Sequence, residues 1–386
     1  MTKKPLEHPF PLVKRLGYLD ALRGFAALYV VVYHVSLIPN PALDVPGWLK
    51  AFVSFGSSGV VLFFVISGFS MCLTWGRHVK TGMPLRSFYI SRLFRIAPLF
   101  YLWLILSLVR DLVFKGEAGL HSANEIAANA FFLFNFYEPF QLGIVWASWT
   151  IGAEMVFYFV FPAIATYVGA SLLKSITLLL SSICAIMVAK AIFGGGMASP
   201  LLHAMLSGVG FLNLLPAFLF GIVTFYFHEL LESKALIKLR RPIGYLLTLS
   251  AIGGIALIIV ERSEAHYWYY ATSACYSSLL LAFSSFGRNP LINLWSLSLG
   301  KGSYSLYLNH PSLVYVLAPL YMIIYRMGYG KCTSFMACVT LTLVILVPLS
   351  YLTFRFVEKP FMHLGKRFLV FSSPKLLKTT CPQDSI

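Results

Sequence analysis

Ten predominantly apolar stretches of about 20 residues constrain the fold of this chain more than any other feature. A helix of that length crosses the hydrocarbon core of a bilayer. Charged residues make up only 11% of the chain, against about 25% in a soluble domain, and hydrophobic residues make up 58%. The sequence therefore predicts an all-α, polytopic membrane protein. The ten predicted spans are residues 18–38, 52–75, 96–114, 144–168, 174–193, 204–227, 243–261, 267–287, 303–326 and 333–357.

Lysine and arginine are unevenly distributed between the segments that join these stretches. With the N-terminus placed in the cytoplasm, the inside segments carry 22 of them and the outside segments at most 6. Cytoplasmic loops of membrane proteins are enriched in positive charge, so we expect both termini to be cytoplasmic. The predicted organisation is a cytoplasmic lead (1–17), a single transmembrane domain (18–361) and a basic cytoplasmic tail (362–386), with no separate extra-membrane domain.

The stretch 126–140 is apolar but short, and Glu138-Pro139 lies near its end. It is therefore predicted to be an interfacial or re-entrant segment rather than an eleventh span. The formal net charge of +16 comes from clusters between apolar stretches, as the positive-inside rule predicts, so we expect membrane lipid and not nucleic acid as a partner.

Metal and disulfide chemistry are not indicated by the sequence. The six cysteines are scattered without a CxxC pair, and the nine histidines show no HxxxH spacing. We expect no metal and no permanently bound cofactor.

Three polar residues interrupt the first apolar stretch. Arg23 and His34 are 11 positions apart, which on a helix places them within about 20° of the same face and about 16 Å apart along the axis. Asp20 lies on the same side, one turn before Arg23. Such groups cost about 2.5–3.5 kcal/mol each in lipid, so the stripe is predicted to face a protein-lined or hydrated cavity. In the alternative interpretation, Asp20 and Arg23 form an ion pair at the membrane edge and His34 only ends the helix.

Six motifs, in order along the chain, resemble those of membrane acyltransferase family 3. The first is the Arg23-x10-His34 pattern in LDALRGFAALYVVVYH, and on its own it would be weak evidence. The resemblance extends over positions 18 to 361, nearly the whole chain. The other five motifs are Gly59–Phe69 (FFxxSGF core), Arg92–Pro98 (RxxRxxP), Trp149–Glu154 (W-S/T-L-x-x-E), Gly300–His310 (G-x-x-S-Y-x-x-Y-L-x-H) and Arg355–Phe361 (E-x-P-F).

The resemblance implies an integral membrane O-acyltransferase of the inner or plasma membrane. Its donor would be an acyl-coenzyme A, with acetyl favoured, and its acceptor a hydroxyl of a surface polysaccharide, lipopolysaccharide or other glycolipid. Many relatives carry an added hydrolase-like domain that completes the transfer. Without one, the chain would acylate its acceptor directly or act with a separate periplasmic transferase or polysaccharide-assembly protein.

Two departures from the family pattern stand out. Ile151 replaces the usual Leu, which changes little. Asn309-His310-Pro311-Ser312 lacks the aromatic residue that often flanks this histidine, so a role for His310 is less secure than one for His34.

An acyl transfer from a thioester to an alcohol needs a site for the anionic donor, a base and oxyanion donors. Arg92 and Arg95, at the predicted cytoplasmic entry of the third span, are candidates for binding the phosphates of coenzyme A, with Arg23 deeper in the membrane. The alternative is that Arg92 and Arg95 merely follow the positive-inside rule, and that Arg23 stays paired with Asp20.

His34 is the candidate general base, because an unperturbed imidazole has a pKa near 6.5. We expect the pantetheine arm to pass beside the first helix and bring the thioester to His34. Glu154 is a second catalytic candidate that could orient His34, relay its proton or bind the acceptor; alternatively it is a structural partner of a Tyr or Trp.

Further polar and small residues within the spans are expected mainly to pack helices together, although one of the polar groups could supply the oxyanion donor. Gly59, Gly68, Gly300 and Gly302 are predicted to allow close backbone approach. The supporting polar set is Ser67, Trp149, Tyr304, Ser305, Asn309 and His310.

Two alternatives to a glycan O-acyltransferase stay open at this point. The acceptor could be a small molecule such as a macrolide, with the same chemistry. In a different class, Asp20, Arg23, His34 and Glu154 could form the proton relay of a transporter.

Overall fold

The computed structural model describes residues 16–193, 199–261, 268–286 and 289–371. It is 84% helical and contains no strand in the part of the chain described, which confirms the all-α fold class. The predicted lead and tail lie largely outside these ranges. The α-helices are α1 Gly17–Leu37, α2 Gly47–Ser54, α3 Gly59–Lys80, α4 Pro84–Lys115, α5 Ala123–Ala130, α6 Trp149–Val168, α7 Leu172–Phe193, α8 Pro200–Leu206, α9 Phe211–Leu231, α10 Arg240–Glu261, α11 Trp268–Ser285, α12 Leu294–Lys301, α13 Ser303–Arg326, α14 Lys331–Thr353 and α15 Lys359–Phe371.

Eight helical segments within the described ranges are long and apolar enough to cross a membrane. The two remaining predicted spans form the helices α1 and α11, of 21 and 18 residues, which are not among these eight. Both carry polar residues at buried positions, Asp20 in α1 and four serine or threonine residues, among them Ser273, in α11. The polytopic architecture is therefore confirmed, while the count of ten and the cytoplasmic termini stay predictions.

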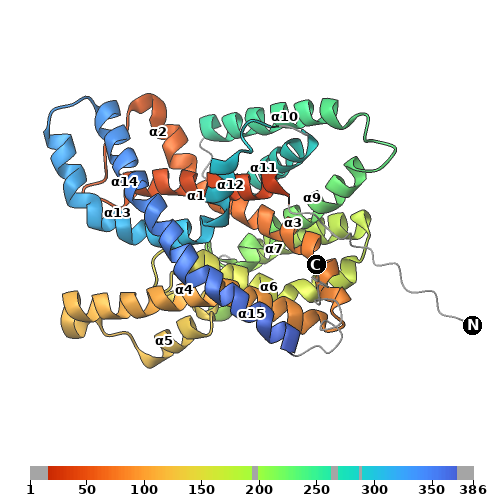
Figure 1. Cartoon of the computed structure of the whole chain (residues 1–386), viewed down its shortest axis with the longest axis horizontal. Helices are drawn as coiled ribbons and strands as arrows, with labels where there is room; N and C mark the ends of the chain where they lie inside the picture. Colours follow the sequence, from red (N-terminus) through yellow and green to blue (C-terminus); the bar gives the residue numbers. More distant parts are fainter. Residues whose placement is uncertain (1–15, 194–198, 262–267, 287–288, 372–386) are drawn as a thin grey trace, which may run out of the picture.

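Helix α1 lies in the middle of the bundle, packed against α3, α12 and α13 (Figure 1). Its side chains Leu22, Val30 and Val31 are at most 1% exposed. The backbone of α12 approaches so closely that a Cβ on Gly300 would lie 1.9 Å from the carbonyl oxygen of Asp20. Because protein surrounds α1, its polar residues face other helices rather than lipid.

Glycines also set the crossing of α3 and α9. A Cβ on Gly68 would lie 2.1 Å from the carbonyl oxygen of Phe218, and one on Gly221 would lie 2.0 Å from that of Val65. Small residues of this kind allow helix backbones to pack closely in membranes. The close approach predicted for Gly59, Gly68 and Gly300 is confirmed.

The same prediction is wrong for Gly302. The nearest atom to a Cβ placed there is 3.9 Å away, an ordinary van der Waals distance. Gly302 instead lies at the junction between α12 and α13, where it is the C-cap of one helix and the N-cap of the next.

Two of the helix starts that differ from the predicted spans affect candidate site residues. Helix α4 begins at Pro84, a favoured residue for the first helical turn, so Arg92 and Arg95 lie well inside the helix rather than at its entry. Helix α6 begins at Trp149 rather than at residue 144, because Ala147 has a φ of +62° that a helix cannot accommodate. Glu154 therefore lies in the second turn of α6.

The segment between α4 and α6 is built from short elements. The predicted interfacial stretch 126–140 forms the end of α5 and two 3₁₀ turns, Phe134–Phe136 and Glu138–Phe140. As expected, it does not form a spanning helix. At the other end of the chain, a π-helical turn, Phe354–Glu358, joins α14 to α15, and α15 packs across α4 (Figure 1).

Candidate active site

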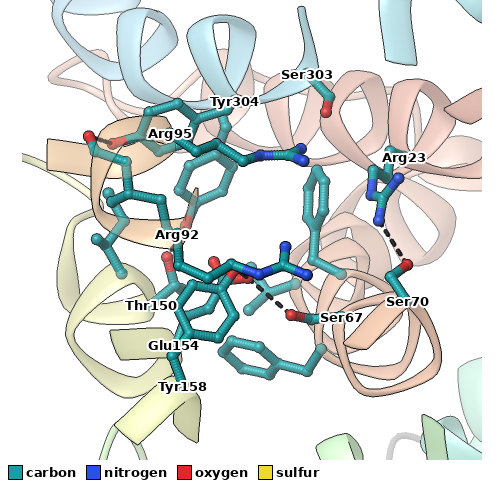
Figure 2. A pocket seen from close by; sticks show the side chains of 16 residues that line it. Arg23, Ser67, Ser70, Arg92, Arg95, Thr150, Glu154, Tyr158, Ser303 and Tyr304 are labelled. Atoms are coloured by element: carbon teal, nitrogen blue, oxygen red, sulfur yellow. Dashed lines mark hydrogen bonds between the residues drawn. The ribbon is translucent and has the colours of Figure 1, made fainter. Parts of the chain in front are cut away.

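A pocket with an empty volume of about 740 Å³, partly open to solvent, lies between α1, α3, α4, α6 and α13 (Figure 2). We call it the donor pocket, after the acyl donor that the family resemblance implies and that is proposed below. The guanidinium groups of Arg23, Arg92 and Arg95 extend into the same open space from two different helices (Figure 2). Glu154 is the one carboxylate among the described lining residues. The pocket is therefore formally positive, which suits an anionic ligand.

Arg23 is held by two partners. Its Nη1 lies 3.5 Å from Oδ1 of Asp20, and its Nη2 donates to Oγ of Ser70 at 2.6 Å. The Asp20–Arg23 ion pair that the alternative interpretation predicted therefore exists. It lies in the wall of the donor pocket and not at an isolated membrane edge. Asp20, 7% exposed, fixes the position of Arg23.

Arg92 and Arg95 come one turn apart from α4. Nη2 of Arg92 donates to Oγ1 of Thr74 at 3.2 Å, and its guanidinium lies 5.2 Å from the ring centre of Tyr158. Its Nε is buried without a hydrogen-bond partner in the described part of the chain. No ion pair is found for Arg95 among those residues. Stacked or incompletely paired guanidinium groups are well placed to bind phosphate.

Glu154 accepts two hydrogen bonds at the base of the donor pocket. Ser67 donates to its Oε1 at 2.8 Å, and Tyr158 donates to the same oxygen at 2.5 Å. The alternative role predicted for Glu154 was that of a structural partner of a tyrosine, and its hydrogen bond with Tyr158 is such a contact. Because Glu154 also lines the pocket, its second oxygen is left to bind a polar group there.

His34 and His310 form a pair at the far side of the donor pocket. Nδ1 of His34 lies 2.9 Å from the carbonyl oxygen of Val30, and Nδ1 of His310 lies 2.5 Å from that of Tyr307. Carbonyl oxygens only accept, so both Nδ1 atoms are assigned the proton when the rings are neutral. The single Nδ1 proton of His34 is then shared between the carbonyl oxygen of Val30 and Nε2 of His310, which lies 3.2 Å from Nδ1, and the Nε2 lone pair of His34 is available to take a proton.

Tyr307 separates the donor pocket from the two histidines. It lines the pocket, where its ring lies 5.7 Å from that of Phe63, and on its other side it lies 5.5 Å from the ring of His310. Its hydroxyl donates to the carbonyl oxygen of Ala147 at 3.2 Å and accepts from Thr150 at 3.0 Å. His34 and His310 do not line the pocket themselves.

The supporting residues fall into two groups. Ser67 and Tyr304 line the donor pocket, and Tyr304 donates to the carbonyl oxygen of Ile96 at 2.9 Å. Ser305 instead donates to Glu358 behind the pocket wall. Asn309 bonds Trp103 at 2.8 Å, and Trp149 is half-buried among apolar side chains. Ser305, Asn309 and Trp149 do not line the pocket.

The pocket contains polar residues that the sequence interpretation did not single out. Apart from Ser303, which directly precedes Tyr304, each lies three or four positions from a predicted one on the same helix, the spacing at which helical side chains become neighbours. This spacing could have identified these residues from the sequence. The residues and their predicted neighbours are Ser70 (Ser67), Thr150 and Tyr158 (Glu154), and Tyr307 (Tyr304).

Two further hypotheses can be compared with this geometry. No group of three His, Cys, Asp or Glu side chains in the described ranges could hold a metal ion. The four proposed relay residues of a transporter divide into separate contacts, since Asp20 pairs with Arg23, Glu154 bonds Ser67 and Tyr158, and His34 bonds His310.

Comparison with known proteins places this geometry in context. The model of an acyltransferase domain family, acyltransferase family 3, matches residues 16–355. A Staphylococcus aureus (strain MRSA252) protein named "Putative O-acetyltransferase SAR0937" is 24% identical over 94% of this chain and 60% of its own length. The O-acetyltransferase OatA of Staphylococcus aureus (strain NCTC 8325 / PS 47) is 27% identical over 39% of this chain and 24% of its own length. No solved structure gives a significant match.

The chain thus spans about 60% of the length of the first of these relatives. The matched family region contains all three pocket arginines, Glu154 and both histidines of the pair.

Proposed function

Because the chain belongs to acyltransferase family 3, we propose that it is an inner-membrane O-acyltransferase that uses cytoplasmic acyl-coenzyme A, with acetyl the expected group, and acylates a hydroxyl of a surface glycan or glycolipid. The observation that carries this proposal is a pocket with three guanidinium groups whose inner wall, Tyr307, contacts the His34–His310 pair. It combines an anion site with a base. Relatives named as O-acetyltransferases support transfer to an oxygen atom, and the glycan class of the acceptor comes from the family resemblance alone.

The donor binds with its phosphates at Arg92 and Arg95 and its arm beside Arg23. Three cations around one partly enclosed pocket favour a polyanion more strongly than they would in bulk water. The thioester end then lies towards Thr150 and Tyr307, and passage to His34 requires the Tyr307 ring to move aside.

His34 removes the proton of the acceptor hydroxyl through Nε2, and the hydroxyl oxygen attacks the thioester carbonyl. The carbon–sulfur bond breaks, the acyl group stays on the acceptor oxygen, and the proton on His34 passes to the sulfur of coenzyme A. His310 acts as a positioning residue, because it holds Nδ1 of His34 through a 3.2 Å contact.

The test is acyl transfer in isolated membranes. Membranes that contain the full chain are incubated with acetyl-coenzyme A labelled in the acetyl group, and the label is followed into glycan, glycolipid and small-molecule fractions. Label in the glycan or glycolipid fraction supports the proposal, and label confined to a small molecule moves the acceptor to that class. Proton-coupled solute uptake without thioester cleavage contradicts the acyl-transfer function altogether.

A further inference from the structure

A basic trough lies beside the donor pocket, along the end of α14, the π-helical turn and α15. It is open to solvent and has an empty volume of about 1120 Å³. A neighbouring hollow shares Lys301 and Tyr351 with it. The residues that define the trough here are Lys301, Tyr351, Arg355, Lys359, His363 and Lys366.

The trough is strongly positive and contains no opposing charge. No carboxylate is present among its described lining residues. In the sequence, Glu358 is the only acidic residue between positions 289 and 371, and its side chain is 2% exposed and accepts from Ser305. The cations are therefore not neutralised from within the trough, which makes it an anion-attracting surface.

Helix α15 presents its basic side chains on one face. Lys359, His363 and Lys366 are separated by four and then three positions, which places them on the same side of the helix. All three are exposed. On the α14 side, Arg355 donates to the hydroxyl of Tyr351 at 3.4 Å, so an aromatic ring lies next to the cations. Cations beside an aromatic ring suit a ligand that combines phosphates with a flat base.

The trough and the donor pocket share two walls. Lys301 lines the trough and Ser303 lines the pocket, so one residue, Gly302, and at most about 7 Å of chain separate the two. On the other wall, α15 packs tightly on α4, since a Cβ on Gly365 would lie 2.8 Å from Cβ of Phe94, the residue before Arg95. A long ligand can therefore occupy both.

We propose that the basic trough binds the nucleoside end of the acyl-thioester donor with its 3′-phosphate, while the donor pocket holds the diphosphate, at Arg92 and Arg95, and the arm that carries the thioester. This inference rests on the proposed function and adds a second phosphate site to it. Lys359 and Lys366 bind phosphate oxygens, and Tyr351 packs against the base. The hollow shape and its position next to the donor pocket favour a nucleotide over a lipid headgroup, which would need only an exposed basic face.

The experiment measures binding to the purified full-length chain in nanodiscs of neutral phosphatidylcholine. The variant combines Lys359→Gln and Lys366→Gln, and the probes are coenzyme A and dephospho-coenzyme A, which lacks the 3′-phosphate. We expect the variant to bind coenzyme A about tenfold more weakly, the usual effect of losing one charge-assisted hydrogen bond. Its preference for coenzyme A over the dephospho form should also shrink.

A matched control removes the same charge elsewhere. Lys50→Gln with Lys174→Gln changes two exposed lysines that do not line the trough. Equal weakening in the control and the trough variant, or unchanged affinity in the trough variant, overturns the inference while the proposed donor stands. If the wild-type chain binds no coenzyme A, the proposed donor fails and the inference with it.

A second set of nanodiscs contains anionic phosphatidylglycerol. If the trough variant binds coenzyme A normally but loses enrichment of phosphatidylglycerol around the protein, the trough is a lipid-headgroup site and the inference is wrong. Thermal unfolding of each variant checks that the fold is intact, and Lys359→Arg with Lys366→Arg should restore coenzyme A binding if charge is what the site requires.

Discussion

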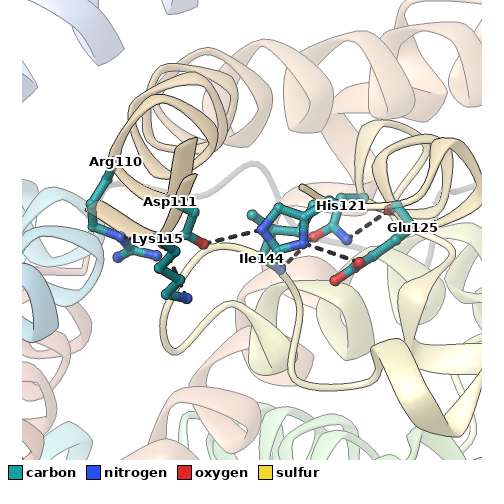
Figure 3. A network of polar contacts seen from close by, with 7 residues as sticks. Arg110, Asp111, Lys115, His121, Glu125 and Ile144 are labelled. Atoms are coloured by element: carbon teal, nitrogen blue, oxygen red, sulfur yellow. Dashed lines mark hydrogen bonds and ion pairs between the residues drawn. The ribbon is translucent and has the colours of Figure 1, made fainter. Parts of the chain in front are cut away.

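Two clusters of charged side chains in this molecule differ in how far their positive and negative charges are paired. Around Asp111, every charge faces an opposite one: Arg110 lies 2.8 Å away, Lys115 3.4 Å and His121 3.1 Å, and His121 also contacts Glu125 at 3.0 Å (Figure 3). In the donor pocket, three arginines share the space with one carboxylate. The difference indicates which cluster stabilises the fold and which one binds.

The Asp111 cluster joins the end of α4 to the segment that follows it. The Asp111 side chain is only 4% exposed, and its partners come from α4 and from the end of the segment that leads into α5. Asn129 continues the contacts by accepting from the backbone nitrogen of Ile144 at 3.0 Å. The cluster therefore ties residues 121–144 to the bundle and leaves no charge for a ligand. By contrast, the donor pocket leaves positive charge unmatched.

The sharpest test of this difference compares alanine variants of one histidine from each region, His34 and His121. We expect His34→Ala to lower acyl transfer by about 10²–10⁴-fold with normal thermal stability, because it removes the proposed base. His121→Ala should do the reverse, lowering the melting temperature while transfer by the folded fraction persists. Labelled acyl transfer and thermal unfolding in detergent measure both effects. Substantial turnover by His34→Ala would remove His34 from the mechanism.

One carboxylate from each cluster provides the second test. Asp111→Ala leaves Arg110 and Lys115 without an acidic partner and removes one of the two carboxylates that contact His121. Losing a hydrogen bond to a charged group of this kind costs about 1.5–3 kcal/mol. We expect a clear loss of thermal stability. Glu154→Gln keeps the size of the side chain and should lower turnover with little change in stability. If instead Glu154→Gln unfolds the protein and keeps its specific activity, Glu154 is structural.

The arginines give a smaller effect. Arg95→Ala is expected to raise the apparent KM for the acyl donor about tenfold or more, because a charge-assisted contact to phosphate is worth about 1.5–3 kcal/mol. Arg110→Ala, which removes one of the ion pairs of Asp111, is the matched control and should leave the donor KM unchanged. Steady-state kinetics at varied donor concentration measure both. An unchanged donor KM in Arg95→Ala would show that Arg95 does not bind the donor and only follows the positive-inside rule.

The smallest effect is predicted for Tyr307→Phe. This change removes the hydrogen bonds to Ala147 and Thr150 but keeps the ring between the donor pocket and His310. Release of the ring should increase acceptor-independent hydrolysis of the thioester a few-fold, since one neutral hydrogen bond is worth about 0.5–1.5 kcal/mol. Coenzyme A release without acceptor is the measurement. Unchanged hydrolysis together with unchanged transfer would show that the Tyr307 hydroxyl does not restrain the ring.

The helical architecture followed from patterns that act over short distances. Apolar stretches of about 20 residues and polar residues at helical spacing required only the period of the helix and the cost of charge in lipid. They predicted a polytopic all-α fold and a polar face on α1. Helix starts were less accurate, because the start of α4 depends on Pro84 and that of α6 on the left-handed conformation of Ala147.

Contacts between distant segments could not be predicted in the same way. His34 and His310 are 276 positions apart, and nothing in either local pattern shows that their rings meet. Tyr307 is one of many tyrosines in apolar helices until the fold places it between Phe63 and His310.

By itself, the sequence determined that the chain is helical, that it is a membrane protein and that its polar residues must avoid lipid, because these depend on composition and helical period. Only the tertiary structure decided which polar residues meet. The close packing of α1 with α12 and of α3 with α9 brings three arginines and one carboxylate around a single pocket and sets the histidine pair behind Tyr307. Such packing depends on the shapes of surfaces far apart in the chain, and a linear pattern does not contain that information.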